Sequence, residues 1–571
     1  MTGAPSRWWA AARETLGADL LSAVVVSVLL IPQSLAYALL AGLPPATGLY
    51  ASLLPLLAYA ALGSSPVLGI GPVAVLALMI SQAVSNSASL ADPASVALVL
   101  AAETGLLLAA AAALRLHALA SLLSVPVLHG FETGAALSIV LSQLPVLLGA
   151  SSGGSNLPDV LRSWWIAASP WHPLTAAFGV VSLAALWVAR SRAAGWFGRW
   201  LPASRAAMVA RLVPLAVLAS ATAIGIAIDA DAHGVARVGS LPALSVHLAW
   251  PPLQPTLWWQ LLPSALPIAL VTFVSSLVVA ESLARRQGGR VLPRRELAGL
   301  AAANLVSAVS AGMPVGGSFS RSVLHLDAGS RTRLAGAFTA VLMGVAIAFV
   351  ADALALLPRA VLAATIIAAV LAMLDLRPFR AAWRYDRAEG LLMAVVALLA
   401  LVSSVTVALA VGVVASVALL LQRSAVPHVA LVGRVPGTEH FRNIGRHEVH
   451  LTPGAMALRI DESLLFLNAR PLTDVVQQLL DGYRRDHGEV RRVVLLMSPV
   501  NHIDLSGLEA LRALHEMLQT LGLRLDLAEV KGPVADALHR SGWEAWFRGR
   551  MFLSLHLAML EPPVPSTPPA A

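Results

Sequence analysis

The sequence contains no cysteine, a single lysine and few charged residues of either sign. Only 12% of its 571 residues are charged, and Lys531 is the one lysine. Without cysteine the chain has no disulfide framework, no cysteine-ligated zinc and no thiol nucleophile. It also lacks a Gly-x-x-x-x-Gly-Lys-Ser/Thr phosphate loop and a His-Glu-x-x-His zinc motif. We therefore expect a protein that is not an enzyme and that carries no cofactor and no metal.

The residues that are present have the composition of a membrane protein. Hydrophobic residues make up 57% of the chain, and the mean hydropathy is +0.76. A helix that spans a bilayer needs about 20 apolar residues, and most of residues 16–422 can be divided into such lengths. The formal charge of +8 comes almost wholly from arginine. Cytoplasmic loops of membrane proteins collect arginine, so we expect contact with membrane lipid and none with nucleic acid.

The hydrophobic region predicts 14 membrane segments, of which two are interrupted. When the N-terminus is placed inside, the loops after the even-numbered segments carry the arginine clusters, as the positive-inside rule requires. Seven crossings per half then make the two halves inverted repeats. The predicted segments are 17–42, 47–62, 66–85, 94–114, 125–149, 172–190, 212–229, 263–284, 296–312, 313–328, 334–352, 358–374 and two within 388–422.

Two glycine- and proline-rich stretches interrupt the hydrophobic segments in matching halves. Residues 68–75 read LGIGPVAV, and residues 313–322 read MPVGGSFSRS. Broken helices in corresponding halves indicate a transporter's site at the middle of the membrane. A helix that begins after each break would direct free N–H groups at an anion, and Arg321 would add a full charge. The alternative is that both stretches are ordinary bends.

After residue 423 the sequence becomes that of a soluble domain. We predict a transmembrane domain over 1–423, a linker over 424–450, a small α/β domain over 451–560 and a disordered tail over 561–571. Within the α/β domain, alternating hydrophobicity predicts paired strands at 457–461 and 464–468 and further strands at 492–497 and 523–529. Helices are predicted at 473–485, 505–521 and 533–540.

These stretches together resemble the SulP anion transporters, the family that includes the solute-carrier-26 proteins. The C-terminal part is similar to a STAS domain. The resemblance implies a core and a gate subdomain, elevator-like alternating access and a homodimer. It also implies a multi-pass protein of the cytoplasmic (inner) membrane with its N-terminus and STAS domain in the cytoplasm. The residues that carry the resemblance are 31–45, 48–50, 71–75, 302–305, 317–322 and 328–332, and in the STAS part 459–463 and 500–507.

The resemblance also implies an anion pocket built from the first segment and from the two interrupted ones. Backbone N–H groups at the two breaks would donate to the anion, with side-chain donors beside them. Arg321 would raise the local positive potential. The implied pocket residues are Gln33, Tyr37, Val73, Ala74, Ser318, Phe319, Ser320 and Arg321.

One departure from the family concerns coupling to an ion gradient. Ser275 occupies the position where many bacterial members carry a glutamate linked to proton coupling. Glu103 and Glu281 are candidate replacements, because an acid inside a membrane is costly to keep and is functional by default. For Glu281 the alternative is that it reaches the interface beside Arg285.

The sequence also contains a possible modification site. Residues 504–507 resemble the phosphorylated site of anti-sigma antagonists, which makes Ser506 a candidate phosphosite. The alternative is that Ser506 only caps the helix that follows.

The sequence thus predicts a secondary active transporter of a small inorganic anion, with sulfate as first choice. The coupling ion, H⁺ or Na⁺, and the choice between symport and exchange stay open. One alternative is a transporter or exchanger of bicarbonate, possibly sodium-coupled, or of another monovalent anion. Another is a membrane-anchored STAS regulator that does not transport.

Overall fold

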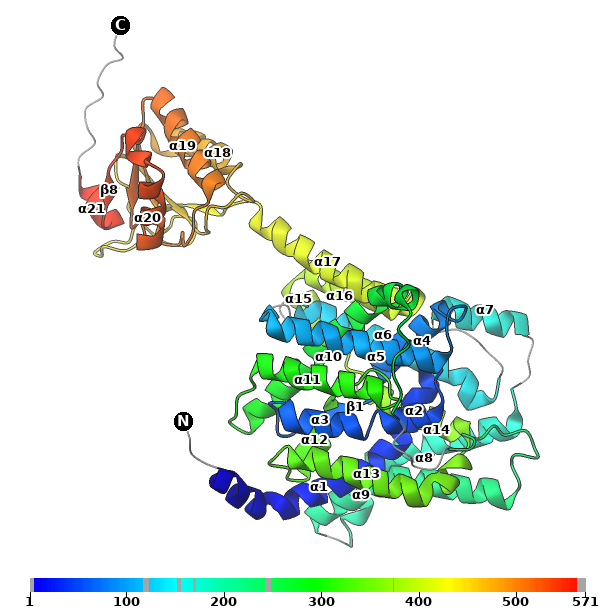
Figure 1. Ribbon diagram of the computed structural model, residues 1–571. Helices are drawn as coiled ribbons and strands as arrows, with labels where there is room; N and C mark the ends of the chain where they lie inside the picture. Colours follow the sequence, from blue (N-terminus) through cyan, green and yellow to red (C-terminus); the bar gives the residue numbers. More distant parts are fainter. Residues whose placement is uncertain are drawn as a thin grey trace. The chain divides into compact units, whose positions relative to one another are not determined.

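The structure is a computed structural model that describes residues 5–116, 123–150, 156–167, 171–200, 202–241, 248–372 and 374–561. The chain divides into two compact units, Met1–Ser416 and Val417–Ala571. The first unit is built from helices and the second contains a six-stranded sheet (Figure 1). Each unit is described separately below.

The first unit consists of helices and two very short strands. The bounds are α1 Pro5–Leu40, α2 Pro45–Tyr50, α3 Leu54–Leu62, β1 Gly69–Gly71, α4 Ala74–Asn86, α5 Pro93–Ala113, α6 Val125–Leu148, α7 Leu157–Ala167, α8 Pro173–Phe197, α9 Ala203–Ala227, α10 Pro255–Arg286, α11 Pro293–Val309, β2 Gly316–Ser318, α12 Phe319–Asp327, α13 Leu334–Ala355, α14 Arg359–Leu371, α15 Arg377–Tyr385, α16 Arg387–Val402 and α17 Val405–Ser424.

The predicted polytopic helical fold is confirmed, and both interrupted segments occur where the glycines and prolines indicated. Among the described residues, eight helices are long and apolar enough to cross a membrane, and shorter apolar helices accompany them. The exact number of 14 segments stays a prediction. The segment expected at 47–62 is divided into α2 and α3, and the short helices α7 and α15 were not anticipated.

The helices pack into two groups, which we call the core group and the gate group. The core group contains α1–α5, α10–α13, β1 and β2; the gate group contains α6–α9 and α14–α16. Neighbours within the core group include α5 with α11, α1 with α13 and α10 with β2, whereas α6 with α16 and α8 with α9 are neighbours in the gate group. Fewer pairs, such as α1 with α14 and α4 with α6, join the two groups. The core helices α5 and α11 lie side by side in Figure 1.

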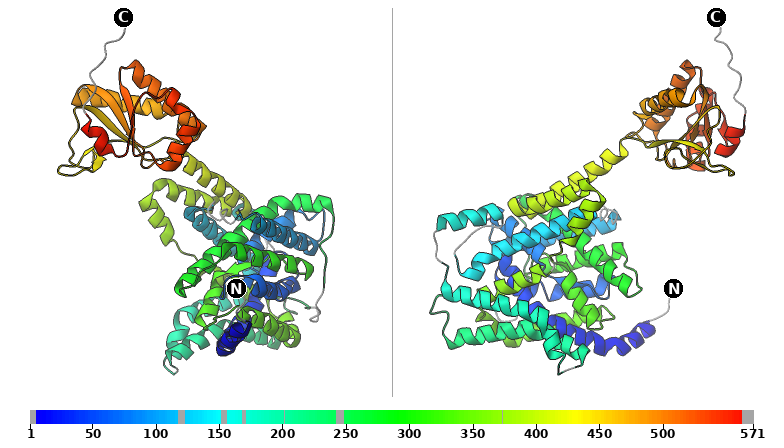
Figure 2. Two further views of the ribbon diagram at one scale, coloured as in Figure 1. Left: turned by 60° about the vertical axis from the view of Figure 1, so that its left-hand side comes forward. Right: turned by 180° about the vertical axis from the view of Figure 1, so that it is seen from behind.

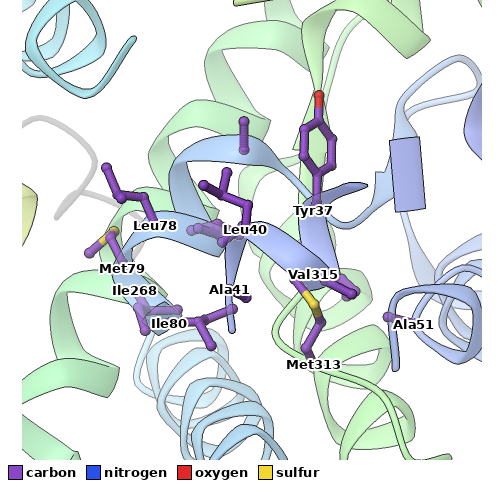
Figure 3. Close-up of a cluster of buried hydrophobic side chains, with 14 of the residues drawn as sticks. Tyr37, Leu40, Ala41, Ala51, Leu78, Met79, Ile80, Ile268, Met313 and Val315 are labelled. Atoms are coloured by element: carbon purple, nitrogen blue, oxygen red, sulfur yellow. The ribbon is translucent and has the colours of Figure 1, made fainter. Parts of the chain in front are cut away.

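The centre of the core group is a tightly packed apolar cluster. It lies where α1, α4 and α10 meet the chain segment that leads into β2 (Figure 3). Such close packing fixes the backbone of the broken segments, because a well-packed interior resists displacement. The cluster residues include Leu40, Ala41, Met79, Ile80, Ile268, Met313 and Val315.

The second unit is an α/β domain with helices on both faces of one mixed sheet (Figure 2). The sheet order is β4-β3-β5-β6-β7-β8, with parallel pairing from β5 to β8. Side chains of successive strand residues alternate between faces. Met456 and Leu458 pack under α18–α20, whereas Ala455 and Ala457 pack under α21. The bounds are β3 Val429–Arg434, β4 Phe441–Asn443, β5 Gly454–Ile460, α18 Leu472–His487, β6 Val490–Leu496, α19 Leu505–Thr520, β7 Arg524–Ala528, α20 Gly532–Arg540, β8 Met551–Phe552 and α21 Leu555–Leu560.

Two expectations for this unit differ from the structure. The segment 424–450, expected to be a linker, contributes β3 and β4, and β3 pairs with β5 along 429–432. The strand expected at 464–468 does not form; Leu464 makes only an isolated bridge with Ile503. The antiparallel partner of β5 is therefore β3. The alternation of apolar and polar residues in β3 is short and follows a polar stretch, which is why the sequence did not indicate a strand there. Of the tail expected at 561–571, residues 562–571 lie outside the described residues.

Candidate functional site

The two broken segments meet in a short antiparallel ladder. Gly69, Ile70 and Gly71 of β1 pair with Ser318, Gly317 and Gly316 of β2, respectively. Each strand continues within three residues into a helix, α4 after β1 and α12 after β2. Because the strands run antiparallel, the two helices leave the ladder in opposite directions. The N-terminus of each helix is thereby directed back toward the ladder.

Neither of these helix N-termini is capped by its own side chain. Val73 is the N-cap of α4 and Ser318 that of α12, and neither makes a side-chain capping bond. The first N–H groups of a helix have no intrahelical acceptor and carry a partial positive charge. Residues Ala74 and Phe319 therefore begin two sets of free donors. Two such sets facing one ladder are suited to bind an anion.

Three side chains from neighbouring helices hold the ladder in place. The Gly317 N–H donates to Ser276 Oγ at 2.8 Å, and the Gly69 N–H donates to Ser322 Oγ at 2.9 Å. Asn304 on α11 bonds both backbone groups of Val315, accepting its N–H at 2.9 Å and donating to its carbonyl at 3.0 Å. These bonds satisfy the glycine-rich backbone inside the helical unit, as a bilayer requires.

Arg321 is the only charged residue in the first turn of α12. Its side chain is 1% exposed. Within the described part of the chain, none of its three guanidinium nitrogens has a hydrogen-bond partner. A Cβ added at Gly71 would lie 3.0 Å from Arg321 Nη1, so the guanidinium packs directly on the β1 backbone. A buried charge without a partner is strongly unfavourable, and this site therefore favours a bound anion.

The other residues predicted around the two helix starts differ in exposure, and their role in binding an anion stays a prediction. Ser320 is exposed and Phe319 is 41% exposed, so the start of α12 is accessible. Ser318 Oγ lies 3.1 Å from Ser320 Oγ. Val73 is half-buried and Ala74 is buried at the start of α4. The structure thus brings the predicted donors and Arg321 to one ladder.

Gln33 and Tyr37 both belong to α1, but they lie in different surroundings. Tyr37 is buried at the edge of the apolar cluster (Figure 3) and lies near Arg321. Gln33, one turn earlier, lines a cavity of about 350 Å³ between α1 and the gate helices α8, α9 and α14. Gln33 therefore faces the boundary between the core and gate groups.

The three coupling candidates are dispersed. Ser275 donates to the Val271 carbonyl at 2.6 Å within its own helix, whereas the adjacent Ser276 reaches the ladder. Glu103 is 4% exposed in α5, and its Oε2 has no hydrogen-bond partner among the described residues. Glu281 is half-buried near the C-terminal end of α10. Of these two serines only Ser276 contacts the ladder, and a coupling role for Ser275, Glu103 or Glu281 stays a prediction.

Sequence reasoning missed several buried polar residues around the ladder. Asn304 lay in a stretch already singled out by the resemblance, but its role became visible only through its contact with Val315. His325, one turn after Arg321, carried no spacing signal at all. Glu296 is fully buried and accepts hydrogen bonds from Tyr59 and Ser64, although it adjoins a basic loop in the sequence. From the sequence alone, a buried Glu296 could not be distinguished from a Glu296 on the surface.

The candidate phosphosite lies at a capped helix. Asp504, not Ser506, is the N-cap of α19, and its Oδ1 accepts the Gly507 N–H at 2.8 Å. The alternative that Ser506 serves as the cap is therefore wrong. Ser506 is half-buried in the first turn, and its phosphorylation stays a prediction.

Comparison with known proteins agrees with this architecture. Residues 16–396 match the Sulfate permease family model and residues 446–558 the STAS domain model. The chain is 31% identical to "Sulfate transporter 4.1, chloroplastic" of Arabidopsis thaliana over 95% of its own length and 79% of that protein. It is 33% identical to a "Probable sulfate transporter" of Mycobacterium tuberculosis (strain CDC 1551 / Oshkosh), with 92% and 91% covered.

Solved structures show the same fold at lower identity. The murine Solute Carrier 26 family member A9 anion transporter, solved in the inward-facing state, matches with a TM-score of 0.82 and 22% identity over 95% of this chain and 90% of that one. The transmembrane domain of the cyanobacterial bicarbonate transporter BicA matches with a TM-score of 0.57 and 21% identity, covering 71% of this chain and 97% of that one. The family models and the relatives establish that the chain belongs to the sulfate permease family, with a C-terminal STAS domain.

Proposed function

We propose that the protein is a secondary transporter that carries a small inorganic anion, sulfate in the first instance, across the cytoplasmic membrane. Family membership and relatives named as sulfate transporters support the substrate class. The site itself supports an anion of either one or two charges, since its donors are backbone N–H groups and one guanidinium.

The observation that carries this proposal is the buried guanidinium of Arg321, which has no hydrogen-bond partner in the described part of the chain. Burying a charge without a partner costs several kcal/mol, an amount on the order of a protein's whole stability. The buried charge at the two helix starts therefore lowers the stability of the anion-free protein, and only a bound counter-ion offsets that cost.

Alternating access is supported by the division into core and gate groups. Two cavities lie along the boundary between the groups. One, of about 350 Å³, adjoins α1 at Leu29, Pro32 and Gln33, and the other, of about 1000 Å³, adjoins the last residues of α1 and Gly42 just after it. Gate helices complete both cavities. We propose that the core group slides against the gate group and exposes the anion first to one cavity and then to the other.

Arginine contacts at helix ends support the proposed orientation. Arg333 donates to the Gly63 carbonyl at 2.7 Å, Arg294 to Ala112 at 3.2 Å and Arg190 to Ala372 at 3.3 Å. These carbonyls lie at the C-terminal ends of α3, α5 and α14, where cations are favourable. Under the positive-inside rule these ends face the cytoplasm, and the N-terminus and the STAS domain do so too. We propose a homodimer as the assembled form.

Uptake of labelled sulfate into proteoliposomes tests the proposal directly. The purified full-length protein is reconstituted and uptake is followed with and without an inward proton gradient, with protein-free liposomes as the blank. We expect saturable sulfate uptake above the blank. Competition by unlabelled bicarbonate or chloride measures how far the site selects a dianion.

The other outcomes point to the alternatives. Uptake of bicarbonate without uptake of sulfate would replace the substrate and keep the transport mechanism. A folded protein that neither transports nor is stabilised by any anion of the panel would contradict transport itself. That result would favour a membrane-anchored STAS regulator.

A further inference from the structure

His325 lies directly behind Arg321 at the ladder. It is one turn further along α12, and residues four apart share one helix face. Its side chain is 3% exposed. A Cβ added at Gly69 would lie 2.8 Å from Arg321 Cβ and 3.4 Å from His325 Cδ2, so both side chains pack on the same glycine. Both also line a cavity of about 10 Å³, close to the size of one water molecule.

The contacts of His325 with Ser22 bear on which nitrogen takes an additional proton. His325 Nδ1 lies 2.9 Å from Ser22 Oγ, where either atom can be the donor, and Ser22 Oγ also lies 3.4 Å from the His325 carbonyl. We take the tautomer in which Nδ1–H donates to the hydroxyl and the hydroxyl donates to the carbonyl. In this tautomer the lone pair of the neutral imidazole is on Nε2, which is the atom that binds an additional proton.

The charged and titratable groups around His325 come from three elements. Arg321 is on α12 itself, Asp19 is a fully buried residue of α1, and Tyr59 of α3 lines the small cavity. Asp19 accepts the N–H groups of Arg331 and Thr332 at 2.8 and 3.2 Å.

The other elements that line the same cavity add no charge. Strand β1 and helix α13 contribute Gly69, Ile70, Gly336 and Thr339, which do not titrate. Asp19 is engaged by the loop after α12 and forms no ion pair with Arg321 among the described residues. One extra proton on His325 would therefore add a second positive charge beside the guanidinium.

We propose that His325 is the proton-binding site coupled to the anion at the two helix starts, so that one proton binds at Nε2 when the anion binds. This inference rests on the proposed function and deepens it. The proton comes from solution and adds to the nitrogen lone pair, and no bond breaks. The site gives the chain a titratable group at the ladder although Ser275 occupies the usual position of the acid.

The coupling follows from charge and distance. Four residues of helix separate His325 from Arg321 by about 6 Å along the axis. The anion at the start of α12 is therefore about 9 Å from the imidazole, and at an effective dielectric constant of about 20 the attraction of opposite unit charges there corresponds to about a 20-fold gain in affinity, and to a larger one for a dianion. By linkage, the proton strengthens anion binding by the same factor as the anion strengthens proton binding.

The position of His325 in α12 also favours the protonated ring. His325 belongs to the last turn of α12, and the C-terminal end of a helix stabilises an imidazolium. The proposed proton site is thus at the end of α12 opposite to the proposed anion site.

The test compares sulfate affinity and proton-driven uptake in the full-length protein and in His325→Gln. Affinity is measured from sulfate-dependent thermal stabilisation between about pH 4 and 8, a range extended below that of ordinary histidines because His325 is buried beside the charge of Arg321. For the wild type we expect sulfate binding to become at least about 20-fold tighter toward low pH. His325→Gln should bind sulfate with one affinity throughout, keep sulfate exchange and lose accumulation driven by a proton gradient.

Two further variants keep the test decisive. Ser22→Ala removes the hydrogen-bond partner of His325 Nδ1 without removing the imidazole, and we expect it to shift the midpoint of the pH profile. This variant also tests the role of His325 if His325→Gln does not fold. His129→Gln is the matched control, because His129 pairs with Glu132 on α6 in the gate group. That control should keep the wild-type pH profile.

The outcomes separate this inference from the proposed function. Wild-type pH dependence in His325→Gln, or a flat profile in the wild type, would overturn the role of His325 while sulfate transport stands. Loss of pH dependence in His129→Gln as well would also contradict the assignment to His325. Absence of any anion binding or transport in the wild type would overturn the proposed function, and the coupling with it.

Discussion

Replacing Arg321 with methionine removes the charge of this side chain and keeps most of its apolar stem. The guanidinium packs on Gly71, two residues before the N-cap of α4, which corresponds to about 7 Å. At that distance a unit charge attracts a monovalent anion by about 2.4 kcal/mol and a dianion by about 4.7 kcal/mol, for an effective dielectric constant of about 20. We therefore expect Arg321→Met to weaken monovalent binding about 50-fold and sulfate binding about 3,000-fold.

The same substitution should not destabilise the anion-free protein. Arg321 is buried and has no hydrogen-bond partner among the residues that the structure describes, so its charge costs free energy until an anion arrives, and an apolar replacement of similar shape avoids that cost. We expect the unfolding temperature of anion-free Arg321→Met to equal or exceed that of the wild type.

Thermal unfolding of the purified full-length protein measures both effects. Sulfate at 100 times its dissociation constant should stabilise the wild type by about 2.7 kcal/mol, and the variant by almost nothing at the same concentration. Arg359→Met is the control, since Arg359 is exposed and donates to the Arg237 carbonyl at 2.8 Å, away from the ladder. Full sulfate-induced stabilisation in Arg321→Met, or equal losses for monovalent and divalent anions, would refute the reasoning.

Three further predictions concern single positions. Ala at Gly71, whose φ is +146°, strains the backbone and presses a Cβ against Arg321; we expect about 1–3 kcal/mol of destabilisation by thermal unfolding, together with weaker sulfate binding. Asp92→Ala removes the N-cap of α5, whose carboxylate accepts a backbone N–H at 3.1 Å, and should cost about 1 kcal/mol in the same assay. Burial lowers the pKa of His515 below its ordinary value of 6.5, so below that pH the unfolded chain binds a proton that the folded chain does not. The stability of the second unit should therefore fall as the pH drops below 6.5. Hydrogen exchange of α19 measures this stability, and His515→Phe should remove that part of its pH dependence.

The positions of the membrane segments and of the two breaks could be predicted from the sequence because their causes are local. A run of apolar residues is sufficient to identify a spanning helix. Glycine and proline interrupt a helix wherever they stand, and so the breaks before α4 and α12 were visible. The same local character made Arg321 a candidate, because it follows the second break by a few residues.

The sequence could not determine which polar residues surround the ladder. Gly69 and Ser322 are 253 positions apart, yet a hydrogen bond joins them. Ser275 and Ser276 are equivalent in the sequence, but the orientation of α10 brings only Ser276 to the Gly317 N–H. In the second unit, β3 became a strand because β5 offers it an unpaired edge.

The sequence by itself thus determined a chain of apolar helices with two breaks and a terminal α/β domain. Hydrophobicity and backbone freedom act residue by residue, and both can be seen along the chain. Only the tertiary structure decided that the two breaks pair, that Arg321 is buried without a partner and that His325 packs behind it. Burial and pairing depend on which distant segments meet in space, and three-residue strands such as β1 and β2 form only in that context.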